Sequence, residues 1–132
     1  DAPVRALYCD RTHGRFWAGA DRGGIFSSED GLRWQKMGGD IEGAVYDINT
    51  TGEQFIAATG HGIVRGNGDG SWQRLGPRML FACIAADGND PQQWLAGASP
   101  GGLWHTDDSG QNWRQLDHFK HVRAILSPEE NA

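Results

Sequence analysis

Short apolar stretches alternate with polar, glycine-rich turns along the whole chain. Stretches of four to six residues bounded by Gly, Asp, Asn or Ser are typical of β-strands. Twelve such stretches form three groups of four: residues 4–9, 15–19, 24–27 and 33–37; residues 44–48, 54–59, 62–65 and 71–75; and residues 80–85, 93–98, 102–106 and 112–116. Since no segment has the 3.6-residue apolar period of a long amphipathic helix, the pattern predicts an all-β fold.

The same order of features returns three times. Glycine, an apolar strand, a short turn and tryptophan recur in residues 24–34, 62–72 and 102–113, so that the tryptophans stand 38 and 41 positions apart. This period is typical of four-stranded propeller blades. We therefore expect three antiparallel blades, at about residues 4–43, 44–79 and 80–121. A two-sheet sandwich is the alternative that strand count alone permits, but the recurrence of turns at matching phase favours a propeller.

The end of the chain repeats its beginning. Residues 122–126 read Val-Arg-Ala-Ile-Leu and echo Val-Arg-Ala-Leu at residues 4–7, which predicts the first strand of a further blade. A propeller usually needs at least four blades to close. Two copies could supply six blades, but residues 122–126 of one copy would compete with residues 4–9 of the other. The pattern therefore favours a segment of a longer array, completed by blades from a longer chain or from another copy.

The turns between the third and fourth strands carry matching residue types. Residues 106–113 read Thr-Asp-Asp-Ser-Gly-Gln-Asn-Trp and residues 27–34 read Ser-Ser-Glu-Asp-Gly-Leu-Arg-Trp. Both resemble the Asp-box, or BNR repeat, in which Ser or Thr, Asp, Gly, a second hydroxyl residue and Trp occupy fixed positions; residues 65–72 resemble a degenerate copy. The positions in this sequence are Ser27, Glu29, Gly31, Trp34, Asn67, Ser71, Trp72, Thr106, Asp108, Gly110 and Trp113.

These turn residues are expected to be structural. A short carboxylate can accept backbone N–H bonds within its own turn, glycine takes the positive φ that the turn needs, and tryptophan fills the layer between blades. The resemblance implies a propeller like those of sialidases, sortilin-type receptors, xyloglucan-cleaving glycosidases and a photosystem II assembly factor. Because these proteins share architecture and not chemistry, the resemblance leaves the function open.

Composition excludes some classes of partner. The 132 residues contain 12 Lys and Arg against 17 Asp and Glu, a net charge of −5, and no basic cluster, so nucleic acid is not an expected partner. No apolar run approaches the roughly 20 residues of a membrane span. Cys9 and Cys83 are expected as two packed thiols and not as a disulfide. No cofactor is expected.

A ligand face follows from the usual blade topology. Loops that join the second strand to the third, or one blade to the next, meet at one end of a propeller. The polar residues expected there are Asp21, Arg22, Asp40, Glu42, His61, Arg78, His118, Lys120 and His121. A metal held by the histidines at 118 and 121 would need a further ligand, for which His61 is the candidate. Paired surface histidines are more often solvated, so no metal site is expected.

A catalytic role would need carboxylates. Asp47 is the carboxylate expected inside an innermost strand, and it is the candidate catalytic residue, with Asp40 or Glu42 as its partner. Glycosidases place two carboxylates roughly 5 to 9 Å apart across a pocket, but Asp beside Gly more often forms turns.

The sequence therefore favours a non-catalytic binding or assembly scaffold that contacts a protein or glycan in an extracellular or periplasmic location. The alternative is part of a xyloglucanase- or sialidase-like glycoside hydrolase. A lectin-like repeat could stack sugars on Trp17, Trp94 or Trp104, although their places in strands favour core packing.

Overall fold

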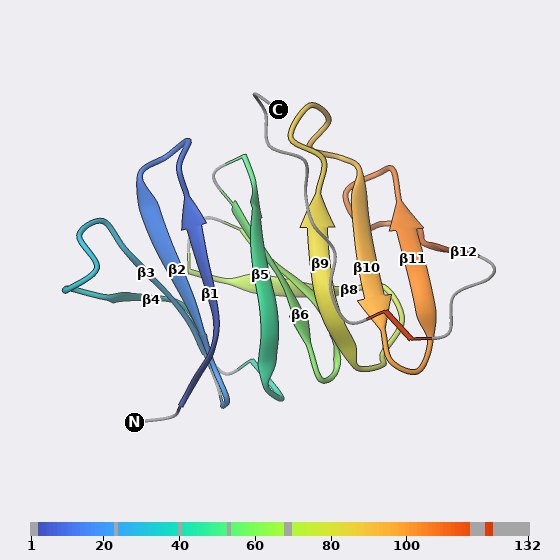
Figure 1. Ribbon diagram of the computed structural model, residues 1–132, viewed down its shortest axis with the longest axis horizontal. Coiled ribbons are helices and arrows are strands. Elements are labelled where there is room, and N and C mark those ends of the chain that lie inside the picture. Colours follow the sequence, from blue (N-terminus) through green and yellow to red (C-terminus); the bar gives the residue numbers. More distant parts are fainter. Residues whose placement is uncertain are drawn as a thin grey trace.

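The computed structural model describes residues 3–22, 24–39, 41–52, 54–67, 70–116 and 121–122, and it is all-β in this part of the chain (Figure 1). Three antiparallel sheets follow one another, each of four strands in chain order. Blade 1 contains β1 (Val4–Asp10), β2 (Arg15–Ala20), β3 (Gly24–Ser28) and β4 (Gln35–Gly39). Blade 2 contains β5 (Val45–Thr51), β6 (Gln54–Thr59), β7 (Gly62–Gly66) and β8 (Trp72–Leu75). Blade 3 contains β9 (Phe81–Ala86), β10 (Trp94–Ala98), β11 (Gly102–Thr106) and β12 (Arg114–Leu116).

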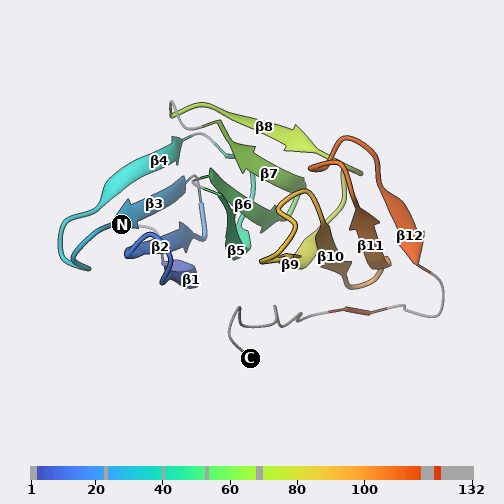
Figure 2. The ribbon, with the colours of Figure 1, turned by 90° about the horizontal axis from the view of Figure 1, so that it is seen from above.

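The blades lie side by side in an arc. Figure 2 shows β1, β5 and β9 on the inner side of the arc and β4, β8 and β12 on the outer side. The three inner strands run in the same direction in Figure 1, so their amino-terminal ends share one end of the molecule. The arrangement is that of consecutive propeller blades, which confirms the fold class expected from the sequence.

Each inner strand contains an irregularity at the same place. The register with the second strand shifts around Arg5 in β1, Tyr46 in β5 and Ala82 in β9. A bulge leaves one residue outside the ladder and redirects its side chain. Because the bulges coincide, they give a residue-by-residue correspondence between the blades.

Two apolar layers hold the blades together. The layer between blades 1 and 2 contains Trp17, Ile25, Val45, Ile48 and Phe55. The layer between blades 2 and 3 contains Ile56, Ile63, Phe81, Ile84 and Trp94. These side chains are at most 3% exposed, so burial of apolar surface against the neighbouring blade is the main stabilising contribution of each layer.

The face of blade 1 that points away from blade 2 has no such cover. Leu7 is 73% exposed, whereas Ile48 at the corresponding position of β5 is 1% exposed. Phe16 is 41% exposed and corresponds to Phe55. Cys9 lies on this face and is exposed, so the expectation of two packed thiols is wrong for Cys9 and holds for Cys83. The reason is the missing neighbour.

Each of the twelve expected strands overlaps an observed strand. Strand β1 continues beyond the expected end to Asp10, so this residue is a second carboxylate in an inner strand. Trp17 and Trp94 are buried and Trp104 is partly buried, as expected from core packing. The expected strand at 122–126 lies outside the described residues except for Val122. In the described part of the chain, no helix has the length and apolar character needed to cross a membrane.

Candidate functional site

The amino-terminal ends of the inner strands, together with the loops beside them, form the candidate site, which we call the mouth. Arg5 and Tyr46 reach it because both are bulge residues, and Asp21 reaches it because it directly follows β2. His61 lies in the turn between β6 and β7 at the same end. The fold thus brings bulge residues of two inner strands and residues of two turns to one end of the molecule.

Arg5 is the centre of this group, and it was missing from the predicted face. Its Nη2 lies 2.6 Å from Oδ1 of Asp21, and its Nε–H donates to the same oxygen at 2.8 Å. Its guanidinium carbon lies 5.3 Å from the centroid of the Tyr46 ring. A cation over an aromatic face is attracted by the ring quadrupole. Arg5 therefore connects two neighbouring blades at their ends.

A second charge pair joins the connection between β4 and β5 to the connection between β8 and β9. Arg78 lies 3.7 Å from Glu42. Arg74 donates to the carbonyl oxygen of His61 at 2.6 Å and to Thr59 Oγ1 at 3.3 Å, and partial burial lowers the pKa of its guanidinium, helped by the nearby charge of Arg78. Two ion pairs, Arg5–Asp21 and Arg78–Glu42, thus lie at the mouth, while Arg74 is held by hydrogen bonds to its neighbours.

The other residues of the predicted face make no contact with the group around Arg5 among the interactions described. Arg22 is exposed, and His121 hydrogen-bonds through Nδ1 to Ser99 Oγ at 2.8 Å. Asp40, His118 and Lys120 lie outside the described residues. Within the part of the chain that the structure covers, no group of three His, Cys, Asp or Glu side chains is arranged to hold a metal ion.

Asp47, the candidate catalytic residue, has a structural environment. Its Oδ2 accepts the N–H of Ile84 on β9 at 2.9 Å, and Oδ1 accepts the N–H of Ile48 at 3.0 Å. Burial raises the pKa of the carboxyl group, against the effect of both hydrogen bonds. Burial also raises the pKa of the neighbouring Cys83 thiol to about 11, with a contribution from the charge of Asp47. The carboxylate therefore links β5 to the next inner strand, and the thiol stays protonated.

The raised pKa of Asp47 predicts a distinct pH dependence. Stability from this group is present below its unfolded pKa of about 3.8 and is lost as the pH rises through the higher folded pKa. We expect the free energy of unfolding of the wild type to fall relative to that of Asp47→Asn across this interval and to stay level above it. Urea titrations at a series of pH values measure the difference. A difference that grows in favour of the wild type with rising pH would contradict the assignment.

The turn between β11 and β12 is held by one carboxylate. Asp108 Oδ1 accepts the N–H of Asn112 at 2.9 Å and the hydroxyl of Thr106 at 2.7 Å, while Thr106 Oγ1 accepts the N–H of Gly110 at 3.0 Å. The backbone N–H of Asn112, followed by its side-chain amide and the Thr106 hydroxyl, lowers the pKa of Asp108 to about 2. Gly110 has φ of +89°. This is the closed turn that the sequence predicted.

The corresponding turn of blade 1 uses residues one place later than the sequence comparison assigned. Ser28 Oγ donates to Asp30 Oδ1 at 3.1 Å and accepts the N–H of Gly31 at 2.8 Å. Asp30 accepts the N–H groups of Leu32 and Arg33, which lower its pKa. Ser27 and Glu29 do not take these roles: Ser27 is buried in β3, and Glu29 is exposed 3.4 Å from Arg15. The turn of blade 1 is one residue shorter, and strand register fixes which serine begins it.

In blade 2 the position of Ser28 and Thr106 is taken by Gly66. A Cβ there would overlap the ring of Phe55, which excludes a hydroxyl side chain at this position. Asn67 and Ser71 close the turn, through Asn67 Nδ2 to Ser71 Oγ at 3.1 Å.

The three turn tryptophans have unequal surroundings. Trp113 packs against the layer between blades 2 and 3, and Trp72 donates its Nε1–H to the carbonyl oxygen of Gly39 in blade 1 at 2.7 Å. Trp34 is 42% exposed because no blade precedes it. Beside it lies an open groove of about 370 Å³, lined by Arg15, Ser27, Ser28, Glu29, Asp30, Arg33, Trp34 and Gln35. The groove thus follows the β3–β4 turn of blade 1.

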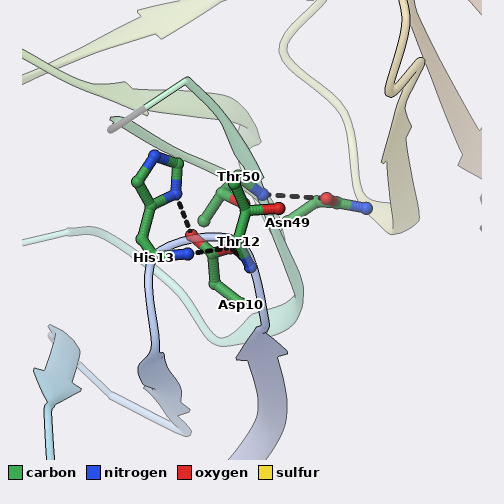
Figure 3. Close-up of polar contacts among 5 residues, drawn as sticks. All are labelled: Asp10, Thr12, His13, Asn49 and Thr50. Atoms are coloured by element: carbon green, nitrogen blue, oxygen red, sulfur yellow. Dashed lines mark hydrogen bonds and ion pairs between the residues drawn. The ribbon is translucent and has the colours of Figure 1, made fainter. Parts of the chain in front are cut away.

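Sequence reasoning missed a polar cluster at the opposite end of β1. Figure 3 shows His13 Nδ1 directed at Asp10 Oδ2, at 2.8 Å, with the N–H groups of Thr12 and His13 donating to Oδ1. Asp10 is 5% exposed. Its oxygens are thus occupied by its own turn, as the spacing Asp-x-Thr-His could have indicated. The cluster closes the β1–β2 turn.

Comparisons with known proteins establish the fold alone. No family model matches the chain, and no curated relative matches it. An ancestral GH74 enzyme superposes with a TM-score of 0.77 at 16% identity over 96% of this chain and 19% of its own. The GH74 xyloglucanase from Xanthomonas campestris gives 0.73 at 19% identity, over 89% of this chain and 21% of its own. The computationally designed Ika4 protein gives 0.76 at 17% identity, over 98% and 82%. The chain thus spans about a fifth of the length of these enzymes.

Proposed function

We propose that the chain is a non-catalytic binding segment of an Asp-box propeller, and that its mouth binds a neutral oligosaccharide. The observation that carries the proposal is the group formed by Arg5, Asp21 and Tyr46. It offers several N–H donors, a carboxylate acceptor and an aromatic side chain, and the charges of its arginine and its carboxylate neutralise each other. Sugar hydroxyl groups need donors and acceptors together, and they do not need net charge. An extracellular or periplasmic location remains a prediction.

The carboxylates at the mouth favour binding over glycoside hydrolysis. Among the described residues there, Asp21 is paired with Arg5, Glu42 lies close to Arg78, and Asp47 accepts two backbone N–H bonds. A general acid and a base or nucleophile must be free to exchange protons or attack the sugar. The alternative remains a GH74-like hydrolase, because a GH74 xyloglucanase shares the fold.

Calorimetric titration with xyloglucan oligosaccharides tests the proposal. We expect measurable binding by the wild type, weakened about tenfold or more in Arg5→Ala, because hydrogen bonds from a charged donor are lost. The matched control is Arg15→Ala, which removes an arginine that lies beside Glu29 and away from the mouth.

Chromatography of the same mixtures separates the two functions. We expect no shorter sugars after incubation. Hydrolysis that Asp47→Asn abolishes would support the hydrolase instead. A wild type that, like the variants, releases or absorbs no heat on titration would contradict glycan binding.

A further inference from the structure

The open face of blade 1 has the chemistry of a blade interface. Leu7 occupies the position at which Ile48 and Ile84 pack against the preceding blade, and Val4, at 60% exposed, occupies that of the fully buried Val45. Apolar side chains at positions that are buried in the other two blades indicate a surface that is made to be covered. The outward face of a blade is the face that the next blade along the chain covers. Whatever covers blade 1 must resemble the outward face of blade 1 or blade 2.

The outward face of blade 3 is a surface of that kind. Gly97 of β10 corresponds to Gly19 of β2, where a Cβ would overlap Val45 of the next blade. At Gly97 a Cβ would overlap Val122, whose N–H donates to the carbonyl oxygen of Ala98 at 2.9 Å. Val122 therefore packs against blade 3 in the same way as Val45 packs against blade 1.

The sequence shows which strand this face accepts. Residues 122–125 read Val-Arg-Ala-Ile, and residues 4–7 at the start of β1 read Val-Arg-Ala-Leu. The corresponding residues of β5 and β9 read Val-Tyr-Asp-Ile and Phe-Ala-Cys-Ile. The segment that begins on blade 3 is thus close in sequence to β1 and to no other inner strand. Strand β1 of another copy therefore has the side chains that fit the outward face of blade 3.

We propose that two copies of this chain associate head to tail, with the open face of blade 1 in one copy packed on the outward face of blade 3 in its partner. Val4 then takes the place of the partner's Val122 on Gly97. Two such contacts, made together, give an assembly of six blades. The segment at Val122 competes for the same place within each copy, and this competition weakens the association.

The composition of this contact fits an interface between separately folded copies. Asp47 of blade 2 reaches Ile84 of blade 3, but the position of Asp47 in blade 3 is Cys83. In the proposed contact Leu7 would therefore meet the small, uncharged thiol of Cys83. Association would not bury a carboxylate, so it avoids the desolvation free energy that Asp47 costs between blades 2 and 3.

Sedimentation velocity of the full chain over a dilution series tests the proposal. We expect the mass to rise with concentration from 14.4 kDa to twice that value. Leu7→Asp should keep the chain at the lower mass, because a carboxylate placed in the apolar contact should weaken association about a hundredfold or more. Leu32→Asp is the matched control, since Leu32 is 85% exposed in a turn and corresponds to no buried side chain.

A second variant tests the place of contact. Val122→Asp removes the competing side chain from Gly97 and should strengthen association, with circular dichroism verifying the fold. Association that survives Leu7→Asp, or that Val122→Asp weakens, would overturn the proposal. A wild type and a Val122→Asp variant that both remain at 14.4 kDa would also overturn it, and would leave the face to a blade from a longer chain.

Discussion

Trp113→Ala should destabilise the protein by about 3 kcal/mol, whereas Trp34→Ala should cost less than about 1 kcal/mol. The two residues end corresponding turns. Trp113 lies 6.4 Å from the ring of Phe81 and 6.3 Å from that of Trp94, centroid to centroid, so its removal leaves a cavity between blades 2 and 3. Trp34 is 42% exposed and faces no blade.

Urea unfolding followed by far-ultraviolet circular dichroism measures both costs, because it does not depend on tryptophan emission. The experiment is performed in the Leu7→Asp background, which keeps the open face uncovered. Equal costs for the two variants would show that the surroundings of the turn tryptophans do not differ as the fold requires.

Gly19→Ala should destabilise the protein by about 2 kcal/mol, although it adds one methyl group. A Cβ at Gly19 would overlap the side chain of Val45, which is fully buried, and it would lie 3.1 Å from Ile48 Cδ1. The layer between blades 1 and 2 would have to open, because neither β-branched side chain has another place to go.

Gly60→Ala is the matched control for this effect. Its Cβ would have no neighbour closer than 3.9 Å, so the substitution should be neutral or stabilise by about 0.5 kcal/mol through the unfolded chain. Thermal unfolding of both variants provides the comparison. A Gly19→Ala variant as stable as Gly60→Ala would mean that blades 1 and 2 do not approach as closely as described.

The period and strand pattern were sufficient to predict the blades, because alternation and turn chemistry are local properties. The turn of blade 1 was misassigned by one residue for a non-local reason. Ser28 begins that turn because it pairs with Phe16 across β2 and β3, as Thr106 pairs with Trp94 in blade 3. A comparison that aligns tryptophans cannot detect a turn that is one residue shorter.

The candidate site shows the same limit. The loops of the predicted face follow from topology. The structure places Asp21 and His61 at the mouth, and their role in ligand binding stays a prediction. Arg5 was not predicted there, because its position depends on a bulge that appears only when strand registers are compared. Asp47 looked available for catalysis because its partner Ile84 lies 37 residues away in another strand.

Nuclear magnetic resonance of the isotope-labelled chain, titrated with xyloglucan oligosaccharides, shows whether the mouth is the ligand face. We expect the amide signals of Arg5, Asp21 and Tyr46 to shift with ligand concentration while those of Asp30 and Asp108 in the outer turns stay in place. Shifts confined to the outer turns, or to the groove beside Trp34, would contradict a ligand site at the mouth.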